Sequence, residues 1–163
     1  MRIIFYISVF CLFSVSFAQE SIEAVLQKFN TDSIPYIKVD ELKALPEKPI
    51  LLDAREADEY EVSHLKDALY VGYQNFQLEN VSCCIKDKER TIVVYCSVGV
   101  RSEDIAFKLK KAGYKNVFNL WGGIFEWKNH GQDVFNLNLQ KTDSVHVFSK
   151  AWEPYLKNGI KVY

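Results

Sequence analysis

Cys96 stands where the sequence joins a strand to a helix. An apolar run that reaches residue 95 ends at this cysteine, and a helical pattern begins six residues later, at Ser102. Backbone N–H groups at a helix N-terminus favour an anion, so a thiol that faces them should have a low pKa. The pattern predicts a nucleophilic cysteine. The alternative is a buried cysteine that serves only as a small apolar side chain.

The loop after Cys96 predicts a cradle for an anion. A thiolate on Cys96 would be anionic, and the loop N–H groups would act as preorganised donors to it. Gly99 allows the backbone to curl with a positive φ, and Ser102 is a good N-cap for the helix. Arg101 would either contact the substrate or brace the loop by pairing with a carboxylate. The expected substrate-binding residues are Ser97, Val98, Gly99, Val100, Arg101 and Ser102.

Strand patterns alternate with helical patterns along the chain. Strands are expected at residues 36–40, 49–55, 68–73, 90–96 and 116–120, and helices at residues 21–30, 39–48, 56–62, 76–78, 102–114 and 124–129. This alternation predicts a parallel α/β sheet, and ligands of such sheets bind beyond the carboxyl ends of the strands. Asp53 and Arg55 end the second strand, on the same rim as Cys96, where we expect them to form a structural ion-pair network.

Three segments resemble the signatures of rhodanese-like domains. The stretch "LLDAREADEYEVSHLKDALYV" resembles the first signature, "YCSVGVRS" the active-site loop and "AGYKNVFNLWGGIFEW" the closing segment. The resemblance implies a single rhodanese-like domain over residues 36–130, with a five-stranded parallel sheet flanked by helices. It also implies a sulfurtransferase that moves sulfane sulfur from a donor such as thiosulfate to a thiophilic acceptor through a Cys96 persulfide. By the same resemblance, the carboxylate partner of Arg101 is Glu59, with Asp53 the next choice.

Two other functions stay open for a chain of this kind. The fold also serves as a non-catalytic binding or regulatory module, although such members often lack the cysteine. Some relatives are phosphatases, whose loops hold five residues between the cysteine and the arginine, whereas Cys96 and Arg101 enclose four. The shorter loop favours sulfur transfer. Because the loop has no cationic side chain besides Arg101, the physiological donor need not be thiosulfate.

The two ends of the chain predict separate segments. Residues 1–18 hold Arg2, an apolar run and a small-residue ending at Ala18, which predicts a signal peptide cleaved there; the alternative is a membrane anchor. We therefore expect an exported protein, periplasmic or secreted, with no membrane attachment after cleavage. Residues 19–35 form a helical lead-in, and residues 131–163 form a C-terminal extension that either packs on the domain or offers a partner surface.

Charge and cysteine content narrow the choice of partners. The net charge of −1 gives no reason to expect nucleic acid. Cys83, Cys84 and Cys96 follow the signal segment, and an odd number of cysteines disfavours a disulfide framework. No spacing of His and Cys suits a metal ion, and no cofactor is expected. The expected partners are a small sulfur donor and a thiol or cyanide acceptor, with a protein acceptor also open. His64 is expected to bond to backbone rather than to form a dyad with Cys96.

Overall fold

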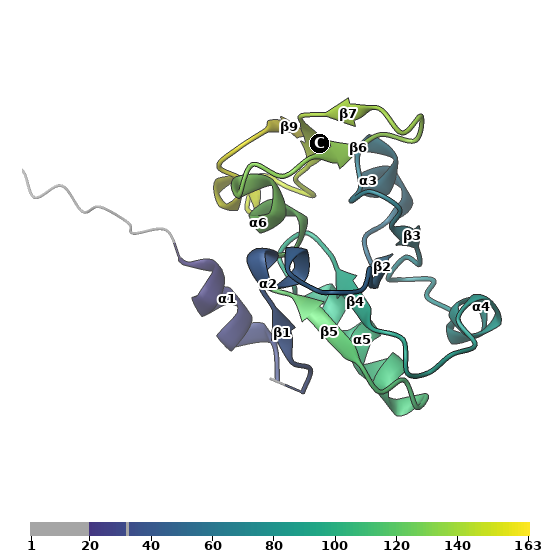
Figure 1. Cartoon of the computed structure of the whole chain (residues 1–163). Coiled ribbons are helices and arrows are strands. Elements are labelled where there is room, and N and C mark those ends of the chain that lie inside the picture. The colour runs from purple at the N-terminus through teal and green to yellow at the C-terminus, as the bar shows by residue number, and fades with distance from the viewer. Residues whose placement is uncertain (1–19, 32) are drawn as a thin grey trace, which may run out of the picture.

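The computed structural model describes residues 20–31 and 33–163, and a five-stranded sheet lies at its centre (Figure 1). The strands are β1 (Tyr36–Ile37), β2 (Ile50–Asp53), β3 (Leu69–Tyr70), β4 (Ile92–Tyr95) and β5 (Val117–Leu120). They follow the order β1-β5-β4-β2-β3, and every neighbouring pair is parallel. The α/β class and the five-stranded parallel sheet expected from the sequence are confirmed. The predicted signal peptide, residues 1–18, lies outside the described residues.

Strand β4 occupies the middle of the sheet, which explains its uninterrupted apolar sequence. Successive side chains of a strand point to opposite faces. Ile92 and Val94 enter one apolar core, and Val93 and Tyr95 enter the other. All four are fully buried, as expected for a strand that is covered on both faces.

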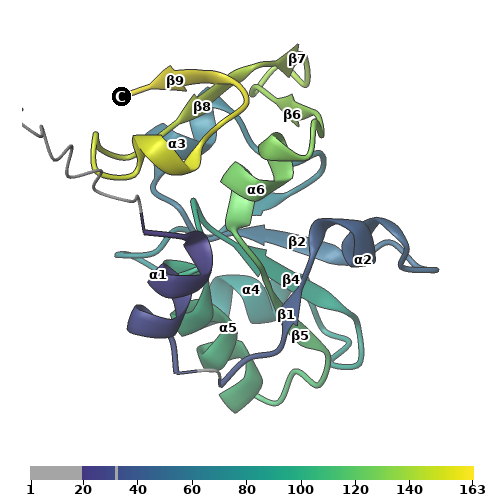
Figure 2. The ribbon, with the colours of Figure 1, turned by 90° about the vertical axis from the view of Figure 1, so that its left-hand side faces the viewer.

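Helices cover both faces of the sheet (Figure 2). They are α1 (Ile22–Phe29), α2 (Val39–Lys43), α3 (Ala57–Val62), α4 (Leu78–Cys84), α5 (Arg101–Lys111) and α6 (Gly123–Asn129). Helices α4 and α5 contribute to the core that holds Ile92 and Val94, whereas α2 and α6 contribute to the core that holds Val93. Among residues 20–31 and 33–163, no helix is both long enough and apolar enough to span a bilayer.

The C-terminal extension packs at the carboxyl edge of the sheet, beside α3 and α6 (Figures 1 and 2). Its elements are the antiparallel pair β6 (Val134–Phe135) and β7 (Lys141–Thr142), the parallel pair β8 (Ser144–His146) and β9 (Ile160–Val162), and a short 3₁₀ helix, η1 (Glu153–Tyr155). Val145, Val147 and Leu156 are buried in the same core as α6. Of the two alternatives left open for this extension, the structure shows packing on the domain.

The predicted N-cap of α5 is wrong. The helix begins at Arg101 and follows Val100, which makes no side-chain cap. The Ser102 hydroxyl instead lies 2.7 Å from Oδ1 of Asn119 in the neighbouring strand β5. A buried acceptor from another element has replaced the local capping bond. At the other end of the helix, Gly113 has a φ of 96°, as expected of a glycine that ends a helix.

Candidate active site

Cys96 follows β4 and lies at the base of the loop that leads into α5. Its side chain is only 1% exposed. Its Sγ accepts a hydrogen bond from the N–H of Gly99 at 3.2 Å and lies 3.5 Å from the hydroxyl of Ser102. The single hydroxyl hydrogen of Ser102 can serve either this sulfur or Asn119. Gly99 has a φ of 110°, a conformation that favours glycine.

Donors from outside the loop bind the carbonyl groups of Cys96, Ser97 and Gly99. The carbonyl oxygen of Gly99 accepts from the side-chain amides of Asn119 at 2.8 Å and Asn30 at 3.0 Å. The carbonyl oxygen of Cys96 accepts from the N–H of Ile124 at 2.9 Å, and that of Ser97 accepts from the N–H of Phe125 at 3.1 Å. Strand β5, the segment after α1 and the start of α6 together fix the loop around Cys96.

These surroundings favour the thiolate form of Cys96. Burial by itself would raise the pKa of the thiol, because it disfavours the charged form. The positive charge of Arg101, the hydroxyl of Ser102 and the N–H groups of Ser102 and Gly99 outweigh burial and hold the pKa of Cys96 below its ordinary value. A thiolate is the nucleophilic form of cysteine, so the lowered pKa increases the fraction of Cys96 that is in the nucleophilic form.

We expect alkylation of Cys96 to follow its lowered pKa. In a Cys83→Ser/Cys84→Ser background, the rate of reaction with iodoacetamide should rise with pH and level off with a midpoint below the ordinary thiol pKa, since only the thiolate reacts. Below that midpoint the sulfur is protonated and the rate falls. Ser102→Ala removes a donor and should move the midpoint to higher pH. A midpoint that stays at the free-thiol value in both proteins would contradict the lowered pKa.

Arg101 braces the loop through Glu59. Its guanidinium donates to both carboxylate oxygens of Glu59, at 2.7 and 2.8 Å, and to the hydroxyl of Ser97 at 2.9 Å. The Ser97 hydroxyl in turn donates to Glu59 at 3.0 Å. Burial alone would raise the pKa of Glu59, but the hydrogen bonds and charge of Arg101 hold it below its usual range. Of the two roles considered for Arg101, the structure shows the bracing contact.

Asp53 and Arg55 form a buried pair at the end of β2. Arg55 Nη2 donates to Asp53 at 2.7 Å and to the carbonyl oxygen of Ser63 at 2.6 Å, and both charged side chains are fully buried. This is the ion-pair network expected at that position. His64 likewise behaves as expected: its Nδ1 lies 2.9 Å from the carbonyl oxygen of Leu65, and its ring stacks on Tyr60.

Asn119 and Gly123 are among the residues of the site that were not predicted from the sequence. Asn119 is fully buried and joins β5 to the loop through Gly99 and Ser102. Its signal was a polar residue inside an otherwise apolar strand. Gly123 lies against the Cys96 carbonyl, and its signal was the second glycine of "WGG" before a helical pattern. Both act through contacts between elements that are distant in sequence.

Gly123→Ala should destabilise the fold strongly. Gly123 has a φ of 54°, and an added Cβ would lie 2.2 Å from the carbonyl oxygen of Cys96. The strained backbone and the overpacking together should cost about 3 kcal/mol or more. Gly131→Ala is the matched control, because Gly131 also has a positive φ, of 70°, but no neighbour within 4 Å. It should cost about 1 kcal/mol. Denaturant titrations measure both, and equal losses would contradict the close approach.

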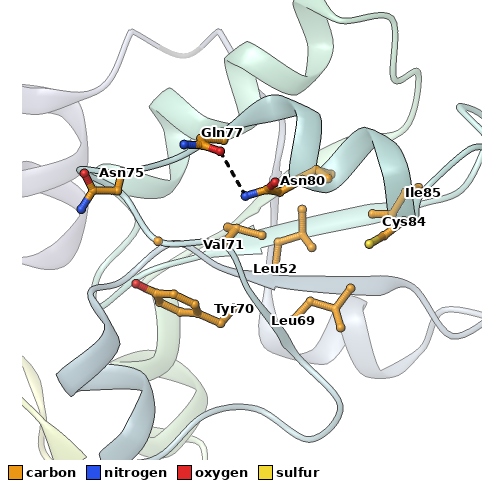
Figure 3. A pocket seen from close by; sticks show the side chains of 11 residues that line it. Leu52, Leu69, Tyr70, Val71, Asn75, Gln77, Asn80, Cys84 and Ile85 are labelled. Carbon is orange, nitrogen blue, oxygen red and sulfur yellow. Dashed lines mark hydrogen bonds between the residues drawn. The ribbon is translucent and has the colours of Figure 1, made fainter.

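A cavity lies between β3 and α4 (Figure 3), and Cys96 is not among the residues that line it. Its volume is about 410 Å³. Leu52, Leu69 and Val71 form apolar parts of its lining, and Cys84 lies at one end, beside Ile85. None of the predicted site residues lines it. Cys83 and Cys84 are exposed free thiols. They differ in this from Cys96, whose thiol is buried and accepts a hydrogen bond from the loop.

Comparison with known proteins connects this geometry to a family. Residues 38–130 match the family model of the rhodanese-like domain. A curated protein of Sodalis glossinidius, tRNA uridine(34) hydroxylase, is 33% identical over 120 residues, which are 71% of this chain and 34% of that protein. The chain spans about a third of the length of the curated relatives it matches.

Solved structures share the fold. The crystal structure of thiosulfate sulfurtransferase from Pseudomonas aeruginosa has a TM-score of 0.59 at 24% identity, over 71% of this chain and 22% of that chain. The solution structure of a rhodanese-like domain from an Anabaena protein has a TM-score of 0.56 at 23% identity, over 63% of this chain and 80% of that chain. With the family model matching more than half of its residues, the chain belongs to the rhodanese-like family.

Proposed function

We propose that this protein is a sulfurtransferase that carries sulfane sulfur as a persulfide on Cys96. The main support for the proposal is the environment of the Cys96 sulfur. This sulfur is buried, accepts a hydrogen bond from the N–H of Gly99 and lies beside the hydroxyl of Ser102. A buried thiol without such donors would be inert, because burial disfavours the thiolate. Here the donors and the charge of Arg101 lower the pKa of the thiol.

The proposed reaction has two displacement steps. The Cys96 thiolate attacks the outer sulfur of thiosulfate; a bond forms between Sγ and that sulfur, the S–S bond of thiosulfate breaks, and sulfite leaves with the electron pair. The acceptor, cyanide or a thiolate, then attacks the terminal sulfur, and the Cys96 thiolate leaves. No external oxidant or reductant is needed. Each anionic stage remains within reach of the loop donors.

The other two functions account less well for the site. A non-catalytic module has no need of a thiol whose surroundings favour its ionised form. A phosphatase would have to place a tetrahedron of oxygens within the loop, and only four residues separate Cys96 from Arg101. The curated relatives are named for tRNA, but this chain spans about a third of their length and has a net charge of −1. A net charge near zero gives no reason to expect a nucleic-acid partner.

Intact mass spectrometry after incubation with thiosulfate tests the proposal. The protein should gain the mass of one sulfur atom, and a reductant should remove it, because a persulfide is a reducible S–S bond. Peptide mapping should place the added sulfur on Cys96. A Cys83→Ser/Cys84→Ser protein serves as the control and should gain the same mass. Absence of the added sulfur, together with aryl phosphate hydrolysis that depends on Cys96, would overturn the proposal in favour of a phosphatase.

We also propose that the protein is exported by its N-terminal segment. The support is the sequence pattern of residues 1–18, an apolar run after Arg2 with a small-residue ending at Ala18. Protein recovered from the exported fraction should begin at Gln19. N-terminal sequencing or mass analysis of that fraction measures this. Full-length protein that retains Arg2 in a membrane fraction would contradict cleavage.

A further inference from the structure

A cavity of about 230 Å³ opens in front of Cys96, and two of its walls come from different parts of the chain. One wall is the loop itself, with Val98, Val100 and Arg101. The other wall is made by Phe148 and Trp152 of the C-terminal extension. Both lie outside residues 38–130, the part that matches the family model. The cavity at Cys96 is therefore completed by residues that lie outside the match to the family model.

Phe148 is held at the cavity in a strained conformation. Its φ is 62°, a left-handed conformation that an aromatic residue rarely adopts. Its N–H donates to Nδ1 of His146 at 3.0 Å, and the preceding Val147 is fully buried. Its side chain is 52% exposed. An exposed aromatic ring kept in place at the cost of backbone strain indicates a function at that position.

Trp152 is fixed to the body of the domain. It is partly buried against the core that holds Val93, and its ring centre lies 5.7 Å from that of Tyr155. The carbonyl oxygen of Tyr155 accepts from the side-chain amide of Asn129 on α6 at 2.9 Å, and Leu156 is buried. The side chains of Phe148 and Trp152 thus form one apolar wall of the cavity.

The charge around this cavity does not suit a small dianion. Among the described residues that line it, Arg101 alone is charged. Its Nη1 and Nη2 atoms both donate to the carboxylate of Glu59. Its Cζ lies 5.0 Å from the centre of the Phe148 ring. A dianion such as thiosulfate would enter this partly enclosed site without a cation free to pair with it, and burying an unpaired charge is costly.

The size of the cavity points to an organic group. An apolar cavity of about 150 Å³ is enough to hold benzene, and this one is larger. We propose that Phe148 and Trp152 select sulfur donors that carry an apolar organic substituent and a single negative charge, such as organic thiosulfonates. The sulfane sulfur would lie at Cys96 and the substituent against the two rings. This inference rests on the proposed sulfur transfer.

The chemistry is the same displacement with a different leaving group. The Cys96 thiolate attacks the sulfane sulfur of the thiosulfonate, and a new S–S bond forms at Sγ. The bond from that sulfur to the sulfonyl sulfur breaks, and a sulfinate leaves with the electron pair. Only the leaving group contacts the wall of Phe148 and Trp152.

Three donors with cyanide as the common acceptor test the inference. Thiosulfate is a dianion, methanethiosulfonate a small monoanion, and benzenethiosulfonate a monoanion with an aromatic ring. Each value of kcat/KM is divided by the rate constant of that donor with a free thiol, which removes intrinsic reactivity. Benzenethiosulfonate should rank first and thiosulfate last. Phe148→Ala and Trp152→Ala should each lower the benzenethiosulfonate-to-methanethiosulfonate ratio about tenfold, the size of one aromatic contact.

Conservative and distant variants make the result specific. Trp152→Phe keeps an aromatic wall and should retain most of the ratio. Phe107→Ala, which removes an exposed aromatic ring from α5, should retain all of it. If Phe148→Ala fails to fold, Phe148→Leu and Trp152→Ala decide the matter. A ratio unchanged in the folded wall variants would overturn this inference alone, whereas failure of every donor to form a Cys96 persulfide would overturn the proposed function with it.

Discussion

Cys96→Ser should abolish sulfur transfer while leaving the fold in place. A serine hydroxyl is far less acidic than this thiol and forms no persulfide, so kcat for thiocyanate formation should fall at least about a thousandfold, as when a nucleophile is removed. The replacement is nearly isosteric, and Gly99 and Ser102 remain as hydrogen-bond partners. The free energy of unfolding should therefore change by about 1 kcal/mol. Colorimetric assay of thiocyanate and denaturant titration measure the two effects.

Cys83→Ser and Cys84→Ser are the controls for this loss. Both thiols are exposed, and their sulfur atoms lie 3.5 Å from each other at the end of α4. Cys96 is also a free thiol, but it is buried. Each control should retain most of the activity. Equal losses from all three substitutions would indicate a disulfide relay in place of a persulfide on one cysteine.

The position of Cys96 was predictable because it depends on local sequence and on a general rule. The apolar residues of β4 specify a strand buried on both faces, and the helical pattern after Gly99 specifies α5. In a parallel sheet, the carboxyl ends of strands share one edge. Asp53 at the end of β2 lies on that edge for the same reason. These inferences needed no knowledge of which side chains touch.

The remaining parts of the site depend on contacts between distant elements. Serine is a favoured N-cap residue, but the hydroxyl of Ser102 instead has a buried acceptor in Asn119, 17 residues away in sequence. Phe148 lies at the active site only because Val145 and Val147 enter the core beside α6. Their apolar character predicts that they are buried somewhere, without indicating against which element. Hydrophobic burial is non-directional, so the partner of the extension could not be read from its pattern.

Arg101→Ala should reduce both activity and stability. It leaves the carboxylate of Glu59 with 1% side-chain exposure and without its charged partner, and an unpaired buried charge costs about 3 kcal/mol. The loop would also lose the contact to Ser97. A small displacement of reacting groups can lower the rate about a hundredfold, and we expect a loss of that size in kcat/KM. Arg101→Lys keeps the charge but not the paired geometry, so it should fall between Ala and the unchanged protein.

A control pair separates this effect from the general loss of an ion pair. Lys48 and Asp67 form a salt bridge whose side chains are 69% and 48% exposed. Lys48→Ala should change the free energy of unfolding by less than about 1 kcal/mol, as is usual for exposed pairs. It should leave kcat/KM unchanged. A loss of activity in Lys48→Ala would mean that the assay reports fold stability and not the brace.

The double-mutant cycle of Arg101→Ala and Glu59→Gln decides whether the two residues act as one brace. If they do, Glu59→Gln should by itself give a similar loss of kcat/KM, because Arg101 would no longer be held by a carboxylate. The double variant should then lose little more than either single variant, since a contact can be removed only once. If Arg101 acts mainly on the substrate, its effect survives without Glu59 and the two losses add. Full additivity in kcat/KM would therefore exclude the brace as the source of the effect, even though the two side chains lie 2.7 Å apart.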